Sequence, residues 1–263
     1  MTKRLALSVF IIAKNEADRI PLTIQSVIDW VDEVIVIDSG SNDETVAVAE
    51  KLGAKVIFND WPGYGQQKRF GEDQCQNDWL LNLDADEEVT PDLASEIKAR
   101  FEDKSYRQVD CWRIMIRDMF AHEDRPAPWA YGYHQIRLYD RRKGRFSQSP
   151  VHDTVRPEDG AKIADLNGIV AHRSIRSLEF QVGKYNRYSD MQVDDMRTRG
   201  RKLSKSRLVI EFPISFFKGY FIRRYWRYGW WGFILATNYA HARFLRVAKA
   251  YEAELSDQSK QDK

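Results

Sequence analysis

The stretch from residue 79 to residue 88 constrains this chain most, because a buried strand runs straight into a dense group of acids. Residues 79–83 are mostly apolar and predict a strand, and four carboxylates follow within five positions: Asp84, Asp86, Glu87 and Glu88. Thr90 and Pro91 then predict a helix start. Carboxylates this close repel one another, and hard cations such as Mg²⁺ favour carboxylate and phosphate oxygens. Asp84 and Asp86 therefore predict a metal–diphosphate site, although a solvated acidic loop before a helix has the same composition.

Strands and helices alternate before this stretch. Apolar runs predict strands at 5–13, 33–38 and 54–58, and helical spacing predicts helices at 20–30 and 41–52, the second opened by a capping box of Ser41 and Glu44. This alternation predicts an α/β fold, with a mixed, mainly parallel sheet flanked by helices.

Polar side chains follow each of these predicted strands. The carboxyl ends of parallel strands meet at one edge of the sheet, which is where ligands bind in such folds. We therefore expect one polar edge made of Asn15, Glu16, Asp38, Asn59, Asp60, Asp84 and Asp86. Lys68 and Arg69 begin a further helix, where they either contact phosphate or form an ordinary surface helix.

The region after residue 105 is less regular. Short strands are predicted at 109–117, 136–139 and 169–172, joined by long loops and a basic turn at 141–145. Such mixed strands and loops are suited to an acceptor pocket. His152 and Asp153 lie in this half, Asp124 lies in the loop 120–128, and His172 ends the last predicted strand.

Three segments together resemble the family 2 glycosyltransferases of GT-A fold, in both order and spacing. They are Ala-Lys-Asn-Glu at 13–16, Val-Ile-Asp-Ser-Gly-Ser-Asn-Asp-Glu-Thr at 36–45, and Asp-Ala-Asp at 84–86. Pro-Val-His-Asp at 150–153 and His172 resemble the subgroup of lipopolysaccharide-core β-1,4-glucosyltransferases. The resemblance covers residues 5–175 well and the remainder more loosely. The Gln-x-x-Arg-Trp motif of processive members is absent, which argues against a polymerising synthase.

The resemblance implies a role for each matching residue. Asn15, Glu16 and Asp38 would hold the nucleotide of a nucleotide-sugar donor. Asp86 would bind Mg²⁺ or Mn²⁺, with Asp84 near the ribose or the metal's water shell. The implied reaction is an inverting transfer of one sugar, glucose from UDP-glucose, to the inner core of lipopolysaccharide.

An inverting transfer requires a base on the acceptor side, away from the metal acids. Asp153 is the preferred candidate, although the subgroup more often has Glu at this position. His152 would orient Asp153 or act as the base itself, and Asp124 is the rival. The same His152–Asp153 pair would also fit a purely structural role in tying down the loop. His172 fits a metal or diphosphate ligand, and equally a buried structural histidine.

The C-terminal region differs sharply in composition. Residues 201–249 hold eleven Lys or Arg but one acid, Glu211, together with thirteen of the 33 aromatics. Aromatic pairs recur at helical spacing between basic residues, which favours an interfacial helix pair on an anionic membrane surface. Packing against the catalytic domain or binding nucleic acid would use similar residues, and we expect no nucleic-acid partner. The longest run without Lys, Arg, Asp or Glu has 15 residues, too short to span a bilayer.

We therefore expect a catalytic domain at 1–200, with a donor half at about 1–105 and an acceptor half at about 106–200. A membrane-association region at 201–251 and a disordered tail at 252–263 would follow. Cys75 and Cys111 are too few for a disulfide framework and suit a reducing cytosol. The expected location is cytoplasmic, on the inner face of the membrane. The alternatives are a transferase that uses a polyprenyl-phosphate acceptor, and a non-enzymatic basic binding module.

Overall fold

The computed structural model describes residues 4–120, 122–149, 153–201 and 203–261. The chain divides into two compact units, residues 1–174 and 175–263. The first unit contains β1 (Leu5–Ala13), α1 (Ile20–Gln25), β2 (Val31–Asp38), α2 (Thr45–Lys51), β3 (Lys55–Phe58), α3 (Tyr64–Gln74), β4 (Trp79–Asp84), β5 (Glu87–Val89), α4 (Pro91–Glu102), a 3₁₀ turn (Ser105–Gln108), β6 (Cys111–Phe120), β7 (Gly132–Asp140), β8 (Gly144–Phe146) and β9 (Val155–Pro157); β10 (Ile163–Ile175) ends at its boundary.

The described strands of the first unit form an eight-stranded mixed sheet in the order β3-β2-β1-β4-β7-β6-β10-β5, and β8 and β9 form a separate pair. The strands β3, β2, β1 and β4 are parallel, and β7, β6 and the β10–β5 pair add antiparallel contacts. Because β1, β2 and β4 have apolar residues on both faces, the centre of the sheet is buried on both sides.

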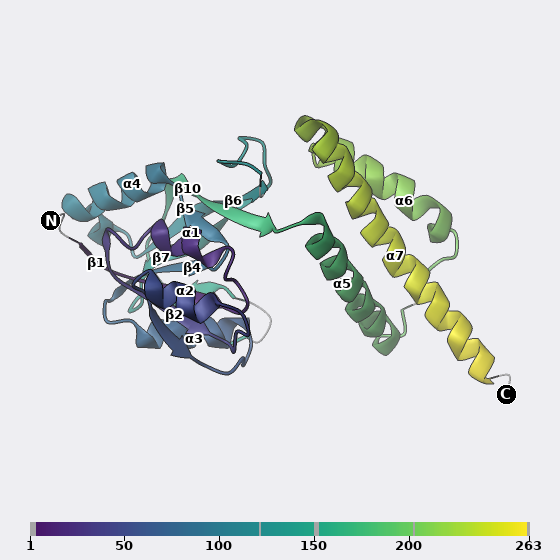
Figure 1. Cartoon of the computed structure of the whole chain (residues 1–263), viewed down its shortest axis with the longest axis horizontal. Helices are drawn as coiled ribbons and strands as arrows, with labels where there is room; N and C mark the ends of the chain where they lie inside the picture. Colours follow the sequence, from purple (N-terminus) through teal and green to yellow (C-terminus); the bar gives the residue numbers. More distant parts are fainter. Residues whose placement is uncertain (1–3, 121, 150–152, 202, 262–263) are drawn as a thin grey trace. The chain divides into compact units, whose positions relative to one another are not determined.

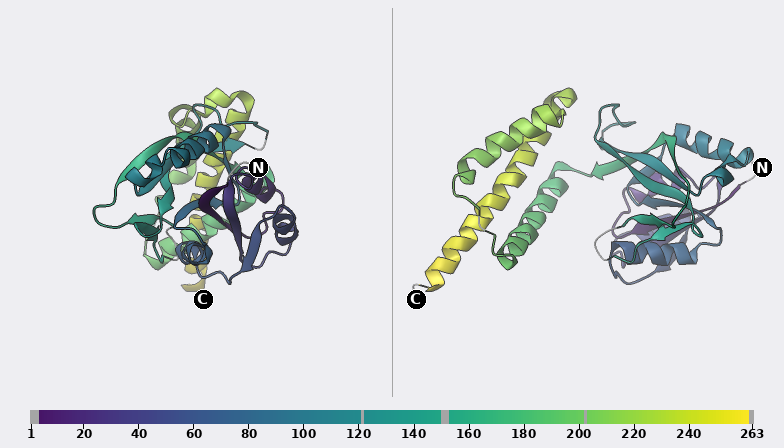
Figure 2. Two further views of the ribbon diagram at one scale, coloured as in Figure 1. Left: turned by 90° about the vertical axis from the view of Figure 1, so that its left-hand side faces the viewer. Right: turned by 180° about the vertical axis from the view of Figure 1, so that it is seen from behind.

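Helices cover both faces of this sheet. Residues of α1, α2 and α4 pack with one set of strand side chains, and Cys75, beside α3, packs with the other. Figures 1 and 2 show α4 and α3 on opposite sides of the sheet. Gly71 lets α3 approach closely, because a Cβ there would lie 2.7 Å from the ring of Phe10 on β1. The predicted α/β fold class is thus confirmed.

The second unit is made of helices. It contains α5 (Leu178–Thr198), α6 (Arg207–Phe217), a π turn (Lys218–Ile222), a 3₁₀ turn (Tyr225–Tyr228) and α7 (Gly229–Gln261). Long α7 runs along both α5 and α6 (Figures 1 and 2). Lys249 Nζ of α7 bonds the backbone oxygen of Asn186 on α5 at 3.0 Å, and Arg243 of α7 pairs with Glu211 of α6 at 3.3 Å.

Several boundaries differ from the sequence-based expectation. The division falls at 174/175 rather than at residue 200, because α5 packs on α7 within the second unit. Residues 252–261 are helical rather than disordered, since α7 continues through them and Asp257 pairs with Arg197 of α5 at 2.9 Å. No helix in the described part of the chain has the length and apolar character needed to cross a membrane.

The structure corrects four further local expectations. Helix α1 stops at Gln25 rather than near residue 30, and α2 begins at Thr45, so Ser41 does not cap it. Glu87 lies in a short strand, β5, rather than in an acidic loop, because β5 pairs with β10. His172 lies opposite Glu87 within β10, which continues to Ile175 instead of ending at the histidine.

Candidate active site

The loop after β2 is organised around the carboxylate of Asp38. Its Oδ2 accepts the backbone N–H groups of Gly40 and Ser41 at 2.9 and 3.0 Å, and its Oδ1 accepts the Ser41 hydroxyl at 2.5 Å. Gly40 has φ +84°, a left-handed conformation that glycine adopts without strain. Asp38 is buried, so the chain fixes this acid at the end of β2 as a rigid part of the sheet edge.

Asn15, at the end of the neighbouring strand β1, is joined to this loop. It adopts a left-handed conformation (φ 58°), its N–H donates to Ser41 Oγ at 2.9 Å, and its Oδ1 accepts the N–H of Asn42 at 2.8 Å. The structure thus brings together Asn15 and Asp38, which the sequence places 23 residues apart. Their polar groups are largely used by the loop itself, so their role toward a nucleotide stays a prediction.

Arg19 connects Glu16 to Asp86, and the sequence analysis did not predict that this arginine belongs to the site. Arg19 donates to Glu16 Oε2 at 2.8 Å and to Oε1 at 2.7 Å, and its Nη1 donates to Asp86 Oδ2 at 2.8 Å. Arg19 also donates to the backbone oxygen of Arg173 at 3.0 Å. This nearly buried guanidinium therefore links the end of β1 to the Asp-Ala-Asp segment.

Asp86 also faces His172 of β10. Asp86 Oδ2 lies 3.5 Å from His172 Nε2, and Asp118 Oδ1 of β6 lies 3.0 Å from His172 Nδ1. Burial alone would lower the pKa of His172, but hydrogen bonds to Asp118 and Asp86 raise it to about 10. Burial would raise the pKa of Asp86, but His172 and Arg19 hold it below its usual range. A protonated His172 would thus be stabilised by both carboxylates, and binding of a metal at Nε2 would require the loss of that proton.

Asp84, the last residue of β4, is held by two cations. Lys68 Nζ of α3 lies 2.7 Å from its Oδ1, and Arg137 Nη2 of β7 lies 3.0 Å from its Oδ2. Burial would raise the pKa of Asp84, but these two positive charges hold it far below its usual range. Arg137 is fully buried and also binds Glu87 and Asn82.

Lys68 pairs with two carboxylates that are far apart in the sequence, Asp84 and Asp153. Its side chain is completely buried, and its Nζ lies 2.7 Å from both Asp84 Oδ1 and Asp153 Oδ2. The backbone oxygen of Asp153 accepts from Gln135 Nε2 at 3.0 Å, while the Asp153 side chain stays 35% exposed. Lys68 is thus engaged by carboxylates rather than open to solvent. Arg69 turns away from it and donates to the backbone oxygen of Phe146 at 3.0 Å.

Two other residues are candidates for the base. His152 lies outside the described residues. Asp124 is exposed in the loop between β6 and β7. Asp153 is therefore the candidate that the described contacts tie to the Asp-Ala-Asp segment, through Lys68.

The residues present fit a divalent cation only in part. Within the described residues, no group of three or more His, Cys, Asp or Glu is spaced to hold a metal. Asp86 Oδ2 and His172 Nε2 do face each other, and Asp118 orients the imidazole as partners of metal-bound histidines do. Both oxygens of Asp84 are taken by Lys68 and Arg137. A cation at Asp86 and His172 would need further oxygens, which a donor diphosphate has.

Sequence reasoning missed three members of this site: Arg19, Arg137 and Asp118. Arg137 could have been predicted from the sequence, because it interrupts the apolar run Ile-Arg-Leu-Tyr at 136–139. An arginine buried in such a strand requires acidic partners. Arg19 and Asp118 each follow another charged residue, Asp18 and Arg117, and so look like ordinary surface positions in the sequence.

Comparisons with known proteins agree with this geometry. The model of "Glycosyl transferase family 2" matches residues 8–157. An uncharacterized glycosyltransferase of Rickettsia felis is 44% identical over 260 residues, which are 96% of this chain and 92% of that protein. The lipopolysaccharide core biosynthesis glycosyltransferase LpsC of Rhizobium meliloti is 30% identical over 269 residues, covering 96% and 94% of the two chains.

Solved structures resemble the chain more distantly. Glucosyl-3-phosphoglycerate synthase of Mycobacterium tuberculosis, crystallised with Mn²⁺ and UDP-glucose, has 18% identity and a TM-score of 0.41, covering 76% of this chain and 81% of that one. The non-enzymatic interpretation is wrong, because the matched family and the named relatives are glycosyltransferases. With its mixed GT-A sheet and its acid-rich strand ends, the chain belongs to glycosyltransferase family 2.

Proposed function

We propose that this glycosyltransferase moves a single glucose from UDP-glucose to the inner core of lipopolysaccharide, with inversion at the anomeric carbon. The observation that carries the proposal is the bridge formed by Lys68. It holds Asp84, at the edge where a donor would bind, and Asp153, an accessible carboxylate, on one buried ammonium group. The acceptor class is supported by the relative LpsC, and the donor by the sequence resemblance.

The reaction proposed here uses Asp153 as general base. Lys68 occupies Oδ2 of Asp153, and the side chain is exposed enough for an acceptor hydroxyl to reach the carboxylate. As Asp153 takes the hydroxyl proton, the acceptor oxygen attacks the anomeric carbon from the face opposite the diphosphate. A new C–O bond forms, the bond to the diphosphate oxygen breaks, and the electron pair leaves with UDP. The Lys68 ammonium group, 2.7 Å from Oδ2, holds the Asp153 side chain in position.

We further propose that Asp86 and His172 hold Mg²⁺ or Mn²⁺ together with the donor diphosphate. When bound, such an ion stabilises the negative charge that develops on the leaving diphosphate. Arg19 and Asp118 position these two side chains. Asn15, Glu16 and Asp38 are proposed to line the nucleotide side of the same edge.

Replacing Asp86 by Asn should weaken metal-dependent binding of UDP at least tenfold, because a neutral amide is a poorer ligand than a carboxylate. Calorimetric titration of UDP at several Mn²⁺ concentrations measures this change. Glu88→Gln is the matched control, since Glu88 is a nearby acid whose carboxylate pairs with Arg173 instead. Equal dependence on Mn²⁺ in the wild type and Asp86→Asn would remove Asp86 from the metal site.

Replacing Asp38 by Ala should raise the KM for the donor about 10- to 100-fold, the range expected when hydrogen bonds to a charged group are lost. Turnover at saturating donor should fall less. Because Asp38 also holds Gly40 and Ser41, the matched control is Asp43→Ala, which removes a carboxylate that holds Thr45 and Ala17 in the same region. A similar KM in both variants would mean that Asp38 only shapes the loop.

A donor and acceptor screen tests the function as a whole. The purified chain is incubated with UDP-glucose, UDP-galactose or GDP-mannose, with Mg²⁺, Mn²⁺ or chelator, and with truncated lipopolysaccharide or polyprenyl phosphate. We expect transfer of glucose to the truncated lipopolysaccharide, with inverted configuration at the new linkage. If sugar is transferred to polyprenyl phosphate alone, the proposed acceptor is wrong. If it is transferred from a different nucleotide sugar, the proposed donor is wrong.

We propose that the helical unit attaches the enzyme to an anionic membrane on the cytoplasmic side. Large apolar side chains are exposed on α6, the turns after it and the start of α7; Val209, Ile214, Ile222 and Trp230 are 78, 60, 66 and 86% exposed. Lys218, Arg224 and Arg227 are exposed among them. Exposed apolar groups rimmed by cations are the composition of an interfacial surface.

Changing Lys218, Arg224 and Arg227 to Glu should release the enzyme from anionic vesicles, because each basic group near such a surface contributes ~1 kcal/mol. Arg223 is left unchanged, since its guanidinium stacks on Tyr239 at 4.4 Å. The control changes three exposed lysines of the first unit, Lys51, Lys55 and Lys104, to Glu. The measurement is co-sedimentation with anionic vesicles at moderate salt. If both triple variants lose vesicle binding equally, the net charge of the protein alone explains its attraction to the vesicles.

A further inference from the structure

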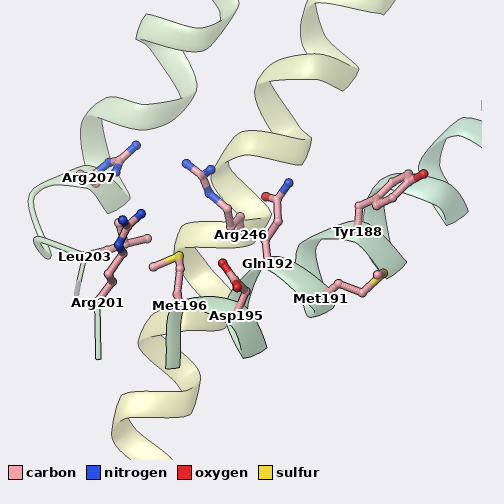
Figure 3. A pocket seen from close by; sticks show the side chains of 9 residues that line it. All are labelled: Tyr188, Met191, Gln192, Asp195, Met196, Arg201, Leu203, Arg207 and Arg246. Carbon is pink, nitrogen blue, oxygen red and sulfur yellow. The ribbon is translucent and has the colours of Figure 1, made fainter. Parts of the chain in front are cut away.

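The helical unit contains a pocket of about 670 Å³ that the sugar-transfer reaction does not use (Figure 3). Helix α5 supplies one wall with side chains at helical spacing, and the segment before α6, the start of α6 and the middle of α7 supply the rest. The lining consists of Tyr188, Met191, Gln192, Asp195, Met196, Arg201, Leu203, Arg207 and Arg246. This volume is within the range of small-molecule sites.

One side of the pocket carries more positive than negative charges. Arg207, Arg243 and Arg246 surround the buried carboxylate of Glu211, with Arg207 Nε at 2.8 Å, Arg243 Nε at 3.3 Å and Arg246 Nη2 at 3.6 Å. One carboxylate cannot balance three guanidinium groups. Arg201 adds a further charge to the same lining.

Arg246 is the most constrained of these cations. Its side chain is 15% exposed, and its Nε is buried without a hydrogen-bond partner among the described residues. Burial, together with the charges of Arg243 and Arg207, lowers the pKa of Arg246. In Figure 3 the head groups of Arg207 and Arg246 point toward one another, and that of Arg201 lies on the same side of the pocket. An anion placed there would gain charge-assisted hydrogen bonds and relieve the repulsion.

The lining also contains apolar side chains that can adapt to a ligand. Met191 is 64% exposed, and Met196, Leu203 and the ring of Tyr188 also face the pocket. Methionine side chains are flexible and adapt to irregular apolar partners. Asp195, the acid of this wall, is paired with Arg199 at 2.8 Å and so does not repel an anion strongly.

We propose that this pocket binds an anionic amphiphile, with a phosphate head group among Arg201, Arg207 and Arg246 and an acyl chain along Met191, Met196 and Leu203. The apolar side chains of the lining argue for a phospholipid over free phosphate, which would leave them without a partner. This inference goes beyond the proposed function and does not depend on it, since binding here requires neither donor nor acceptor.

The test is binding of monomeric dihexanoyl phosphatidic acid to the full-length protein by calorimetry, with inorganic phosphate and dihexanoyl phosphatidylcholine as comparisons. We expect the phosphatidic acid to bind at least tenfold more tightly than either. Arg246→Gln and Arg201→Gln should each weaken it about tenfold. Arg187→Gln, an equal charge change at an exposed position of α5 outside the lining, should change it less than twofold.

A second variant tests the apolar part without disturbing the packing of the helices. Met191→Glu, at an exposed position, should weaken phosphatidic acid binding about tenfold and leave the thermal unfolding temperature unchanged. Equal effects of Arg187→Gln and Arg201→Gln would overturn the proposal in favour of general charge attraction. If inorganic phosphate binds as tightly as phosphatidic acid, the ligand does not need an acyl chain and the proposal is wrong. If phosphatidylcholine binds as tightly, the ligand does not need an anionic head group and the proposal is likewise wrong.

Discussion

Replacing Asp153 by Asn is expected to lower kcat by roughly 10²–10⁴-fold, the contribution of a positioned general base, with little change in UDP affinity. The amide keeps the shape of the side chain and still accepts a hydrogen bond from Lys68, but it cannot take the proton of an acceptor hydroxyl. The backbone oxygen of Asp153 keeps its bond from Gln135 in both proteins. Single-turnover transfer of labelled glucose, together with calorimetric UDP titration, separates the chemical step from donor binding.

Asp124→Asn is the matched comparison, because it makes the same change at the exposed acid that rivals Asp153. Its kcat should stay within a few-fold of the wild type. If Asp124→Asn causes the large loss and Asp153→Asn a loss under about tenfold, the base belongs to the loop between β6 and β7. If Asp153→Asn loses UDP binding, Asp153 contributes to donor binding by positioning Lys68.

The parallel half of the sheet was predictable because each of its strands carries its own local pattern. Apolar runs that end in polar residues mark β1, β2 and β4, and the parallel connection rule places those ends on one edge. The sequence could therefore place Asn15, Asp38, Asp84 and Asp86 near one another without any knowledge of their contacts. The family resemblance added their chemical roles, which the fold alone does not supply.

The partners of these acids were not predictable, since they come from elements joined by antiparallel pairing and loops. Arg137 reaches Asp84 because β7 pairs with β4 through Leu138 and Leu81. Asp118 reaches His172 from β6, which follows β7 in the sheet order rather than in the sequence. Strand register across such pairs depends on which side chains must be buried together, and no local period encodes it.

The C-terminal corrections have a similar origin. The polar composition of residues 252–261 predicts disorder, but one face of α7 has a partner in α5, with Arg197 bound to Asp257 and Lys249 bound to Asp190. Tertiary packing thus stabilises a helical segment that would be only marginally stable in isolation. The same contacts assign α5 to the helical unit and set the boundary at 174/175.

Replacing Arg137 by Met is expected to lower the free energy of unfolding of the first unit by ~3–5 kcal/mol, the cost of leaving a buried partner charge unpaired. Arg137 and Glu87 are both almost completely buried, and burial already raises the pKa of Glu87 despite the charge of Arg137. Met fills much of the space of the arginine but leaves Glu87 without a cation and Asp84 with Lys68 alone. Differential scanning calorimetry of the full-length protein measures the loss.

Two further variants decide whether the unpaired charge is the cause. Arg142→Met removes an arginine that is 63% exposed and paired with Asp140, so its cost should stay below ~1 kcal/mol. Adding Glu87→Gln to Arg137→Met removes the stranded charge and should restore part of the stability. If the double variant is as unstable as Arg137→Met, the loss comes from packing and from the bonds of Arg137 to Asn82 and Asp84. If Arg137→Met unfolds like Arg142→Met, Glu87 is protonated in the folded protein and the buried pair contributes no charge interaction.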